Sequence, residues 1–225
     1  MYQYVTDKVF LKESYSLCAD LVNQLVQALK KEGIQTMMTT VGSKKRGLVT
    51  QNEQGKIDFD FNLWILVADD YSDCRRLKFT IMRVFDNVLQ ENGHFNIHSH
   101  DSTSAINTDY FRFKKGNKTP FKMDICIVKE DRYGCWNRLV HEKTGNAIYD
   151  RWYWNQGPNG NDIGKKEEFL KSEAKYWNEV REVYLYKKNM YLSRNDHDHP
   201  SFKVYIESIN EVYSKYQLTA MYRRG

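Results

Sequence analysis

Three aspartates have the residue type and the spacing to do chemistry together. Asp58 and Asp60 stand two residues apart in a segment that alternates polar and apolar residues, so on a strand both carboxylates leave the same face. Asp124 has the same setting in the later segment 121–128. If the two strands are neighbours in one sheet, the three carboxylates meet. A hard, oxygen-seeking cation such as Mg²⁺ or Mn²⁺ is then the expected occupant.

A small turn followed by three cations lies upstream of these aspartates. Gly42 and Ser43 would let backbone amides approach a ligand, and Lys44, Lys45 and Arg46 follow directly. That composition suits phosphate, although the same charges would also suit an exposed turn. A phosphate-holding turn beside a three-carboxylate metal patch supplies the groups that phosphoryl or nucleotidyl transfer needs.

Periodic apolar patterns predict the elements that would position these residues. Helical spacing predicts two helices, at 11–32 and 73–90. Alternating or β-branched segments predict strands, at 36–41, 56–67, 105–113 and 121–128, with the last two forming an antiparallel pair. A second hairpin is expected from 136–141 and 147–154, and residues 44–57 are expected to form a small hairpin extension. After a loop at 157–160 the pattern becomes helical, with Pro200 opening the last helix.

The order of these elements indicates an α+β fold. A mixed or antiparallel sheet flanked by helices is expected, followed by a mostly helical C-terminal part. We therefore predict a catalytic core at residues 1–135, and a hairpin with helices at 136–225 that acts as a lid or substrate-binding part.

The sequence resembles the DNA polymerase beta-type nucleotidyltransferase superfamily. Members carry a Gly-Ser turn, a hydrophobic-flanked Asp-x-Asp and a third carboxylate on a later strand. Here these are Gly42-Ser43, Asp58-Phe59-Asp60 and Asp124, with a helix between the second and third pieces. The resemblance covers about residues 10 to 130, and the helical C-terminal part is similar to the lid that many members place over the nucleotide.

The resemblance implies a role for each matching residue. Asp58 and Asp60 would bind two divalent metals, and Asp124 would help to bind one and accept the proton of the acceptor hydroxyl. Ser43 would hold the β- and γ-phosphates. The substrate implied is a nucleoside triphosphate, with ATP expected first, and the leaving group is pyrophosphate. Lys171, Lys175 and Tyr176 fall where lid residues of the family reach the triphosphate and base, with a solvated helix face as the alternative.

Two other groups of residues could bind ligands. The histidine runs at 98–101 and 196–199 offer zinc ligands, but tetrahedral sites need ligands from separated elements, so neither is expected to bind zinc. The second run, just before Pro200, is interpreted as a polar turn between helices. Several aromatic residues close together could stack a nucleic-acid base or pack in the core: Trp136, Tyr149, Trp152, Tyr153 and Trp154. Core packing is the expectation for this group.

Whole-chain features narrow the class of partner. The formal charge of +5 is spread along 225 residues rather than gathered in a tail, which argues against long nucleic acid and favours a small molecule, a nucleotide or a protein as acceptor. Four cysteines without a Cys-x-x-Cys pair, and a start without a signal-peptide pattern, predict a cytoplasmic protein. The longest apolar run, at 63–68, is far too short for a membrane helix, so no membrane partner is expected. Two alternatives stay open: a catalytically silent nucleotide-binding module of the same fold, and an enzyme that adds nucleotides to RNA ends.

Overall fold

The computed structural model describes residues 1–222 apart from 54, 71, 158–160 and 197, and its chain forms two compact units. The larger unit comprises the described residues of Val5–Val49 and Gln54–Gly157. The smaller unit comprises those of Met1–Tyr4, Thr50–Glu53 and Pro158–Gly225. Each unit has its own core, so each is described separately.

A mixed sheet forms the larger unit, and its described strands number seven. In spatial order along the main path they are β2 (Gln35–Thr40), β4 (Ile57–Val67), β7 (Phe121–Glu130), β6 (Ile106–Thr108) and β5 (Ser99–Asp101). The hairpin of β8 (Trp136–Glu142) and β9 (Arg151–Gln156) extends the sheet from the end of β7. The central strands β4 and β7 are parallel, and the other pairs are antiparallel.

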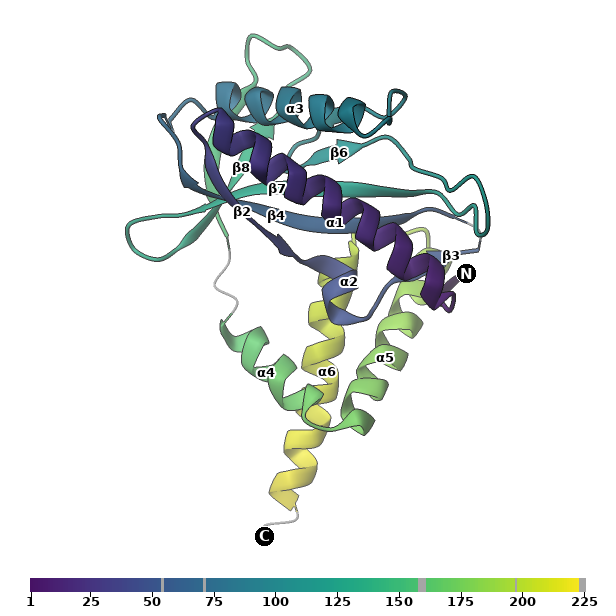
Figure 1. The fold of residues 1–225 in the computed structure, drawn as a ribbon. Coiled ribbons are helices and arrows are strands. Elements are labelled where there is room, and N and C mark those ends of the chain that lie inside the picture. The colour runs from purple at the N-terminus through teal and green to yellow at the C-terminus, as the bar shows by residue number, and fades with distance from the viewer. Residues whose placement is uncertain (54, 71, 158–160, 197, 223–225) are drawn as a thin grey trace. The chain divides into compact units, whose positions relative to one another are not determined.

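Two helices lie across one face of this sheet, α1 (Lys8–Lys31) and α3 (Cys74–Glu91) (Figure 1). Each begins at an aspartate whose side chain accepts a backbone N–H of the first turn: Asp7 from Phe10 at 2.9 Å, and Asp73 from Arg76 at 2.8 Å. Their apolar faces bury leucines and phenylalanines against every second residue of β4 and β7. The opposite face of the sheet carries the alternate, mostly polar residues of the same strands.

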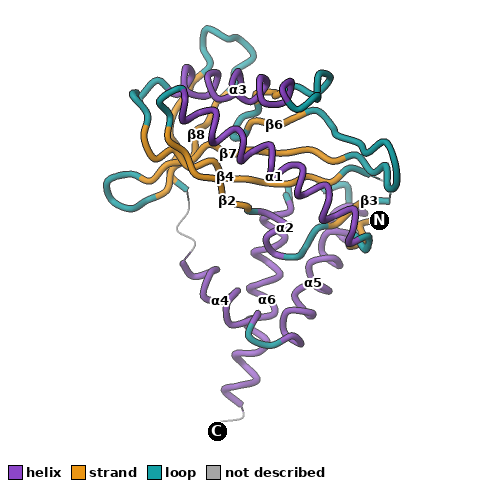
Figure 2. Tube along the Cα trace, in the orientation of Figure 1, coloured by secondary structure: helices purple, strands orange, loops and turns teal. Residues whose placement is uncertain are grey.

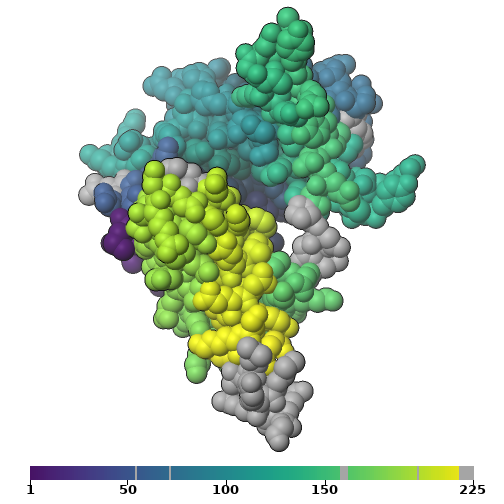
Figure 3. All heavy atoms as spheres, turned by 180° about the vertical axis from the view of Figure 1, so that it is seen from behind, coloured from purple at the N-terminus to yellow at the C-terminus, as the bar shows by residue number. Residues whose placement is uncertain are grey.

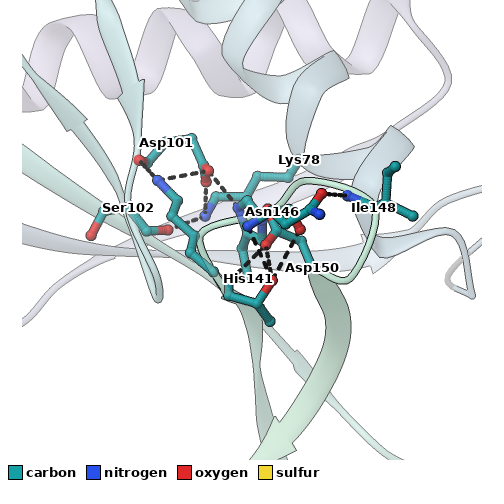
Figure 4. Close-up of polar contacts among 9 residues, drawn as sticks. Lys78, Asp101, Ser102, His141, Asn146, Ile148 and Asp150 are labelled. Carbon is teal, nitrogen blue, oxygen red and sulfur yellow. Dashed lines mark hydrogen bonds and ion pairs between the residues drawn. The ribbon is translucent and has the colours of Figure 1, made fainter.

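A buried charge cluster joins α3 to the helix-covered face of the sheet (Figure 4). Lys78 of α3, only 1% exposed, places its ammonium 2.6 Å from Asp101 Oδ1 on β5 and donates to the Ser102 carbonyl at 2.5 Å. Asp101 is paired with the core residue Ile106, and directly opposed residues share a face, so Asp101 points toward the helices. The cluster therefore replaces apolar packing with a matched ion pair.

The histidine of β8 extends this cluster to the β8–β9 loop. His141 Nδ1 lies 2.5 Å from Asp101 Oδ2, and Nε2 lies 3.0 Å from Asp150 Oδ2. The His141 ring stacks on Trp152 with centroids 3.5 Å apart. Asp150 also accepts the Thr144 N–H at 2.8 Å, which closes the loop 143–150, while the contact with His141 ties the loop to the sheet.

The smaller unit consists of helices and a two-stranded ribbon. Helices α4 (Asn161–Lys171), α5 (Ala174–Ser193) and α6 (Ser201–Tyr222) pack together, with α5 beside α6 (Figures 2 and 3). Their core is apolar and includes Leu170, Val180, Tyr184, Val204 and Ile209. Strands β1 (Tyr2–Tyr4) and β3 (Thr50–Asn52) pair antiparallel. The Asn189 side chain of α5 accepts the Tyr2 N–H and donates to the Tyr2 carbonyl.

The α+β fold class and its main elements are confirmed, and the smaller elements differ from the sequence prediction. Residues 44–57 do not form a hairpin extension: 42–46 are a short helix, α2 (Gly42–Arg46), and β3 pairs with the N-terminal strand β1. The segment predicted as a strand at 105–113 keeps only β6 and one bridge, Phe111 to Phe121. Residues 158–160 of the predicted loop lie outside the described residues. No helix in the described part of the chain combines the length and hydropathy that crossing a bilayer requires.

Candidate active site

The Asp-x-Asp pair lies on β4, the strand with the clearest alternation. Along β4 buried and more exposed residues take turns, which sends Ile57, Phe59 and Phe61 into the core. Asp58 and Asp60 consequently leave the face that α1 and α3 do not cover. Asp58 has an exposed side chain, whereas Asp60 is half-buried.

Parallel pairing brings the third aspartate to the same place. In the β4–β7 register Asp60 is the partner of Asp124, and Asp58 is the partner of Lys122. Neighbouring strands lie about 4.8 Å apart, so the Asp60 and Asp124 side chains leave the sheet side by side. The prediction that the two strands are neighbours is confirmed, and the structure places Asp58, Asp60 and Asp124 on one patch.

The patch also holds a lysine that links two of the carboxylates. Lys122 Nζ donates to Asp124 Oδ1 at 2.8 Å and lies 4.0 Å from Asp58 Oδ1. Burial lowers the pKa of Lys122, but the hydrogen bond and charge of Asp124 outweigh it and leave the pKa raised. Lys122 is therefore a fixed cation of the site.

Asp60 shows the effect of crowding three carboxylates together. Burial, followed by the charges of Asp124 and Asp58, raises the pKa of Asp60 to about 6, while Lys122 and Arg46 act in the opposite direction. Strongly raised carboxyl pKa values are common where a protein keeps like charges together for a ligand. At Asp60, burial and the neighbouring carboxylates thus outweigh the nearby cations.

The Gly-Ser turn packs directly against Asp60. Val41 N–H donates to the Asp60 carbonyl at 3.0 Å, and Gly42 has a positive φ of 66°. A Cβ atom at Gly42 would lie 2.0 Å from Asp60 Oδ2, so only glycine allows this approach. Ser43 follows at the start of α2, and its carbonyl accepts the Leu48 N–H at 2.9 Å. The Gly42-Ser43 turn is thus packed directly against the Asp60 carboxylate.

The cations that follow the turn are only partly directed at the carboxylates. Arg46 lowers the pKa of Asp60 through its charge. Lys44 instead lies over the Tyr15 ring, 4.9 Å from its centroid, and Lys45 is an exposed residue of α2. The phosphate-binding role of Lys44 and Lys45 stays a prediction.

The three lid residues predicted from sequence lie in the smaller unit, where each has local surroundings. Lys171 pairs with Glu167 at 2.5 Å and lies over the Trp177 ring. Tyr176 stacks on Phe169 and packs on Tyr216, and Lys175 is exposed at the start of α5. These contacts leave the predicted nucleotide contacts of Lys171, Lys175 and Tyr176 as predictions.

The donor set of the patch fits a hard divalent cation in kind, but its ligands are not assembled. Carboxylate oxygens are the ligands that Mg²⁺ and Mn²⁺ accept. Within the described residues, no three His, Cys, Asp or Glu side chains are grouped closely enough to hold a metal ion. The ammonium of Lys122 lies near two of these carboxylates, 2.8 Å from Asp124 Oδ1 and 4.0 Å from Asp58 Oδ1.

The histidine runs make local contacts with carboxylates. His100 lies 2.8 Å from Asp109, and His199 Nδ1 lies 2.9 Å from Asp196. His197 lies outside the described residues. Of the aromatic group, Trp152 and Trp154 pack against the core as expected, whereas Tyr149 is 69% exposed and Tyr153 is 39% exposed.

Lys122 and Asn107 also lie beside Asp124, and neither was predicted from the sequence as part of the site. Lys122 is two residues before Asp124, so the alternation that placed Asp124 on the open face also placed Lys122 there. Asn107 of β6 is the partner of Asp124, and its Oδ1 atom is buried without a hydrogen-bond partner. No sequence signal reveals Asn107, because its position depends on the register of β6 with β7.

Comparison with known proteins identifies the fold. No protein-family model matches the chain, and no curated protein matches it in sequence. Solved structures do match. Vibrio cholerae DncV cyclic AMP-GMP synthase, in complex with the linear intermediate 5′ pppA(3′,5′)pG, aligns with a TM-score of 0.53 and 11% identity over 80% of this chain and 47% of its own.

CdnC from E. coli MS115-1 is similar over a larger share of the chain. The structure with ATP aligns with a TM-score of 0.55 and 15% identity, over 88% of this chain and 58% of CdnC. The CdnC:HORMA-deltaN complex gives a TM-score of 0.56 at 15% identity, over 88% and 57%. The chain thus spans about half the length of the solved structures that it matches. The likeness shows that this chain has the fold of DncV and CdnC.

Proposed function

We propose that this chain is a divalent-metal-dependent nucleotidyltransferase. It would move a nucleoside monophosphate from a nucleoside triphosphate, ATP first, to a hydroxyl acceptor, with release of pyrophosphate. The observation that carries the proposal is the meeting of Asp58, Asp60 and Asp124 on adjacent parallel strands beside the Gly42-Ser43 turn. The fold supports it, because solved structures of this fold include a cyclic AMP-GMP synthase.

Each residue has a role that follows from its position. Asp58, Asp60 and Asp124 would hold Mg²⁺ or Mn²⁺, which supplies charge stabilisation at the reacting phosphate and lowers the pKa of a bound hydroxyl. Asp124 would accept the acceptor's proton. Ser43 and the Gly42 backbone would bind the β- and γ-phosphates, while Lys44 and Lys45 would add positive charge. Lys171, Lys175 and Tyr176 of the smaller unit are proposed as further nucleotide contacts.

A nucleotide is the acceptor that the comparisons favour among those open from the sequence. The DncV structure is a complex with a linear intermediate in which two nucleotides are joined, and one CdnC structure is a complex with ATP. A second nucleotide would offer its ribose hydroxyl to the α-phosphate. A small molecule, a protein side chain and an RNA end remain the other acceptors to test. We keep a cytoplasmic location as part of the proposal, on the cysteine pattern alone.

A silent nucleotide-binding module is the second candidate, and one observation favours it. Lys122 already pairs with two of the three carboxylates. A module that binds nucleotide without catalysis would keep such a pair permanently. An active enzyme must break the Lys122 ion pair when the metal binds.

The test follows the label of the α-phosphate. The full chain is incubated with each of four α-³²P-labelled triphosphates, Mg²⁺ or Mn²⁺, and a cell extract. We expect label in a small product that resists phosphatase, with pyrophosphate released. The double variant Asp58→Asn/Asp60→Asn should abolish it, while Asp69→Asn, an exposed carboxylate just beyond the end of β4, should not.

The other outcomes decide between the candidates. Label on RNA would establish the RNA-end enzyme, and label on protein would identify a protein acceptor. Nucleotide binding without pyrophosphate release, over all acceptors in the extract, would overturn transfer in favour of the silent module.

A further inference from the structure

Lys122 occupies a distinctive place in the carboxylate site. Its side chain is only 14% exposed, and its ammonium contacts both Asp124 at 2.8 Å and Asp58 at 4.0 Å. It belongs to the same strand as Asp124, two residues earlier, so the backbone fixes it beside the site. The ion pair is thus built into β7.

The Lys122 ammonium resembles a metal ion because it is a compact positive charge. It is a compact point charge with three donors, so it can bind carboxylates from several directions. It is also monovalent, and its distance of 2.8 Å to oxygen is longer than the 2.0–2.1 Å of a Mg²⁺ ligand. Lys122 can therefore hold Asp58 and Asp124 near one another without satisfying all three carboxylates.

A divalent cation and this ammonium cannot use Asp124 in the same way at once. A metal bound by both Asp58 and Asp124 would lie close to the Lys122 ammonium, which is 2.8 Å from Asp124 Oδ1 and 4.0 Å from Asp58 Oδ1. The positive charges of the metal and of the Lys122 ammonium would repel each other strongly at close range in a half-buried site. Entry of a metal should thus break the Lys122 pair.

We propose that Lys122 is an internal counter-ion of the site, which holds Asp58 and Asp124 together in the metal-free protein and is displaced when a divalent cation binds. The inference deepens the proposed function and rests on it for one point only, that the cation binds at these carboxylates. Lys122 is thereby a positioning residue that weakens the affinity for metal.

The first test measures Mn²⁺ binding directly, by calorimetry and by the loss of the free-ion electron paramagnetic resonance signal. Lys122→Met should bind Mn²⁺ about tenfold more tightly than wild type, because no ammonium has to leave. Lys115→Met, at an exposed position with the same change of net charge, should stay within about twofold of wild type. Lys122→Arg should bind no more tightly than wild type.

A purely structural lysine would give the opposite result. Its loss would weaken Mn²⁺ binding or leave it unchanged. If wild type binds Mn²⁺ and Lys122→Met binds it no more tightly than Lys115→Met does, the inference about Lys122 is wrong and the proposed function still stands. If no variant binds Mn²⁺ and no label is transferred from triphosphates, the proposed function fails as well.

A second measurement uses the wild-type protein, in case Lys122→Met does not fold. The ammonium protons of Lys122 are held by Asp124, and their exchange with water can be followed by ¹⁵N NMR of the lysine side chains. Saturation with Mg²⁺ should accelerate this exchange for Lys122 and leave Lys115 unchanged. Unaltered exchange of Lys122 at saturating Mg²⁺ would contradict displacement.

Discussion

Two charged clusters lie on the two faces of one sheet, and they are built differently. On the helix-covered face, Lys78 and Asp101 form a buried pair that is extended by His141 and Asp150 (Figure 4). On the open face, Asp58, Asp60 and Asp124 lie together, and Lys122 pairs with Asp58 and Asp124. Each cluster draws residues from several strands of the same sheet.

The pKa shifts report the difference between the clusters. Burial raises the pKa of Asp101, but hydrogen bonds from Lys78 and His141 outweigh it, so the pKa lies below its ordinary value. The pKa of Asp60 is raised to about 6, because burial and two neighbouring carboxylates act together. A stabilising cluster matches its charges internally. In the open-face cluster, burial and crowded carboxylates outweigh the nearby cations at Asp60.

The largest effect is expected from removing a carboxylate of the open face. Asp124→Asn should reduce nucleotidyl transfer by about 10³-fold or more, since charge stabilisation at the reacting phosphate and proton acceptance are both lost. The assay is release of pyrophosphate under saturating ATP and Mg²⁺. Asp101→Asn, on the covered face, should retain transfer to the extent that it folds. Transfer by Asp124→Asn within tenfold of wild type would remove Asp124 from the catalytic set.

The next largest effect is on stability, in the covered cluster. Lys78→Met should lower the free energy of unfolding by about 3 kcal/mol, because Asp101 would lose its closest cation inside the protein. Lys143→Met is the matched control: Lys143 lies 3.2 Å from the same carboxylate but is 47% exposed, so its loss should cost less than about 1 kcal/mol. Urea denaturation measures both. Equal costs for the two variants would show that burial of the Lys78 pair does not matter.

The smallest effect is the opposite response of the two clusters to pH. A raised folded pKa contributes stability below the unfolded value of 3.8, and this contribution is lost as pH rises through about 6 for Asp60. A lowered folded pKa, as in Asp101, contributes stability above 3.8 that is lost only in more acidic solution. In metal-free buffer, the stability difference between wild type and Asp60→Asn should thus change by about 1–2 kcal/mol between pH 4 and pH 7. The difference for Asp101→Asn should stay constant between pH 5 and pH 7, and a parallel change in both would refute the distinction.

The open-face site could be predicted from sequence where a period of two residues determined it. The alternation in β4 placed Asp58 and Asp60 on one face, and the same period in β7 placed Asp124. The parallel pairing of these strands could enter only as a condition, because nothing local in the chain specifies which distant strands pair. The position of Asn107 was hidden for the same reason.

The remaining differences come from short elements and from contacts between distant residues. The short helix α2 has no apolar period to reveal it, and β3 is a strand only because β1 pairs with it. Lys122 has the sequence context of an ordinary exposed lysine on a strand. Only the register of β7 with β4 shows that it faces Asp58. The covered cluster was not predicted. Lys78 lies on the apolar face of α3, and its partner Asp101 is distant in sequence.

Asp60→Asn tests the central claim most directly. The claim is that the crowded carboxylates of the open face lower the free energy of unfolding and serve nucleotidyl transfer. The variant removes one of three crowded charges and keeps the shape of the side chain. In metal-free buffer at pH 8, its free energy of unfolding should exceed that of wild type by about 1–2 kcal/mol, while transfer from ATP with Mg²⁺ falls by about 10³-fold. A variant that is less stable than wild type, or that keeps transfer within tenfold, would contradict the account.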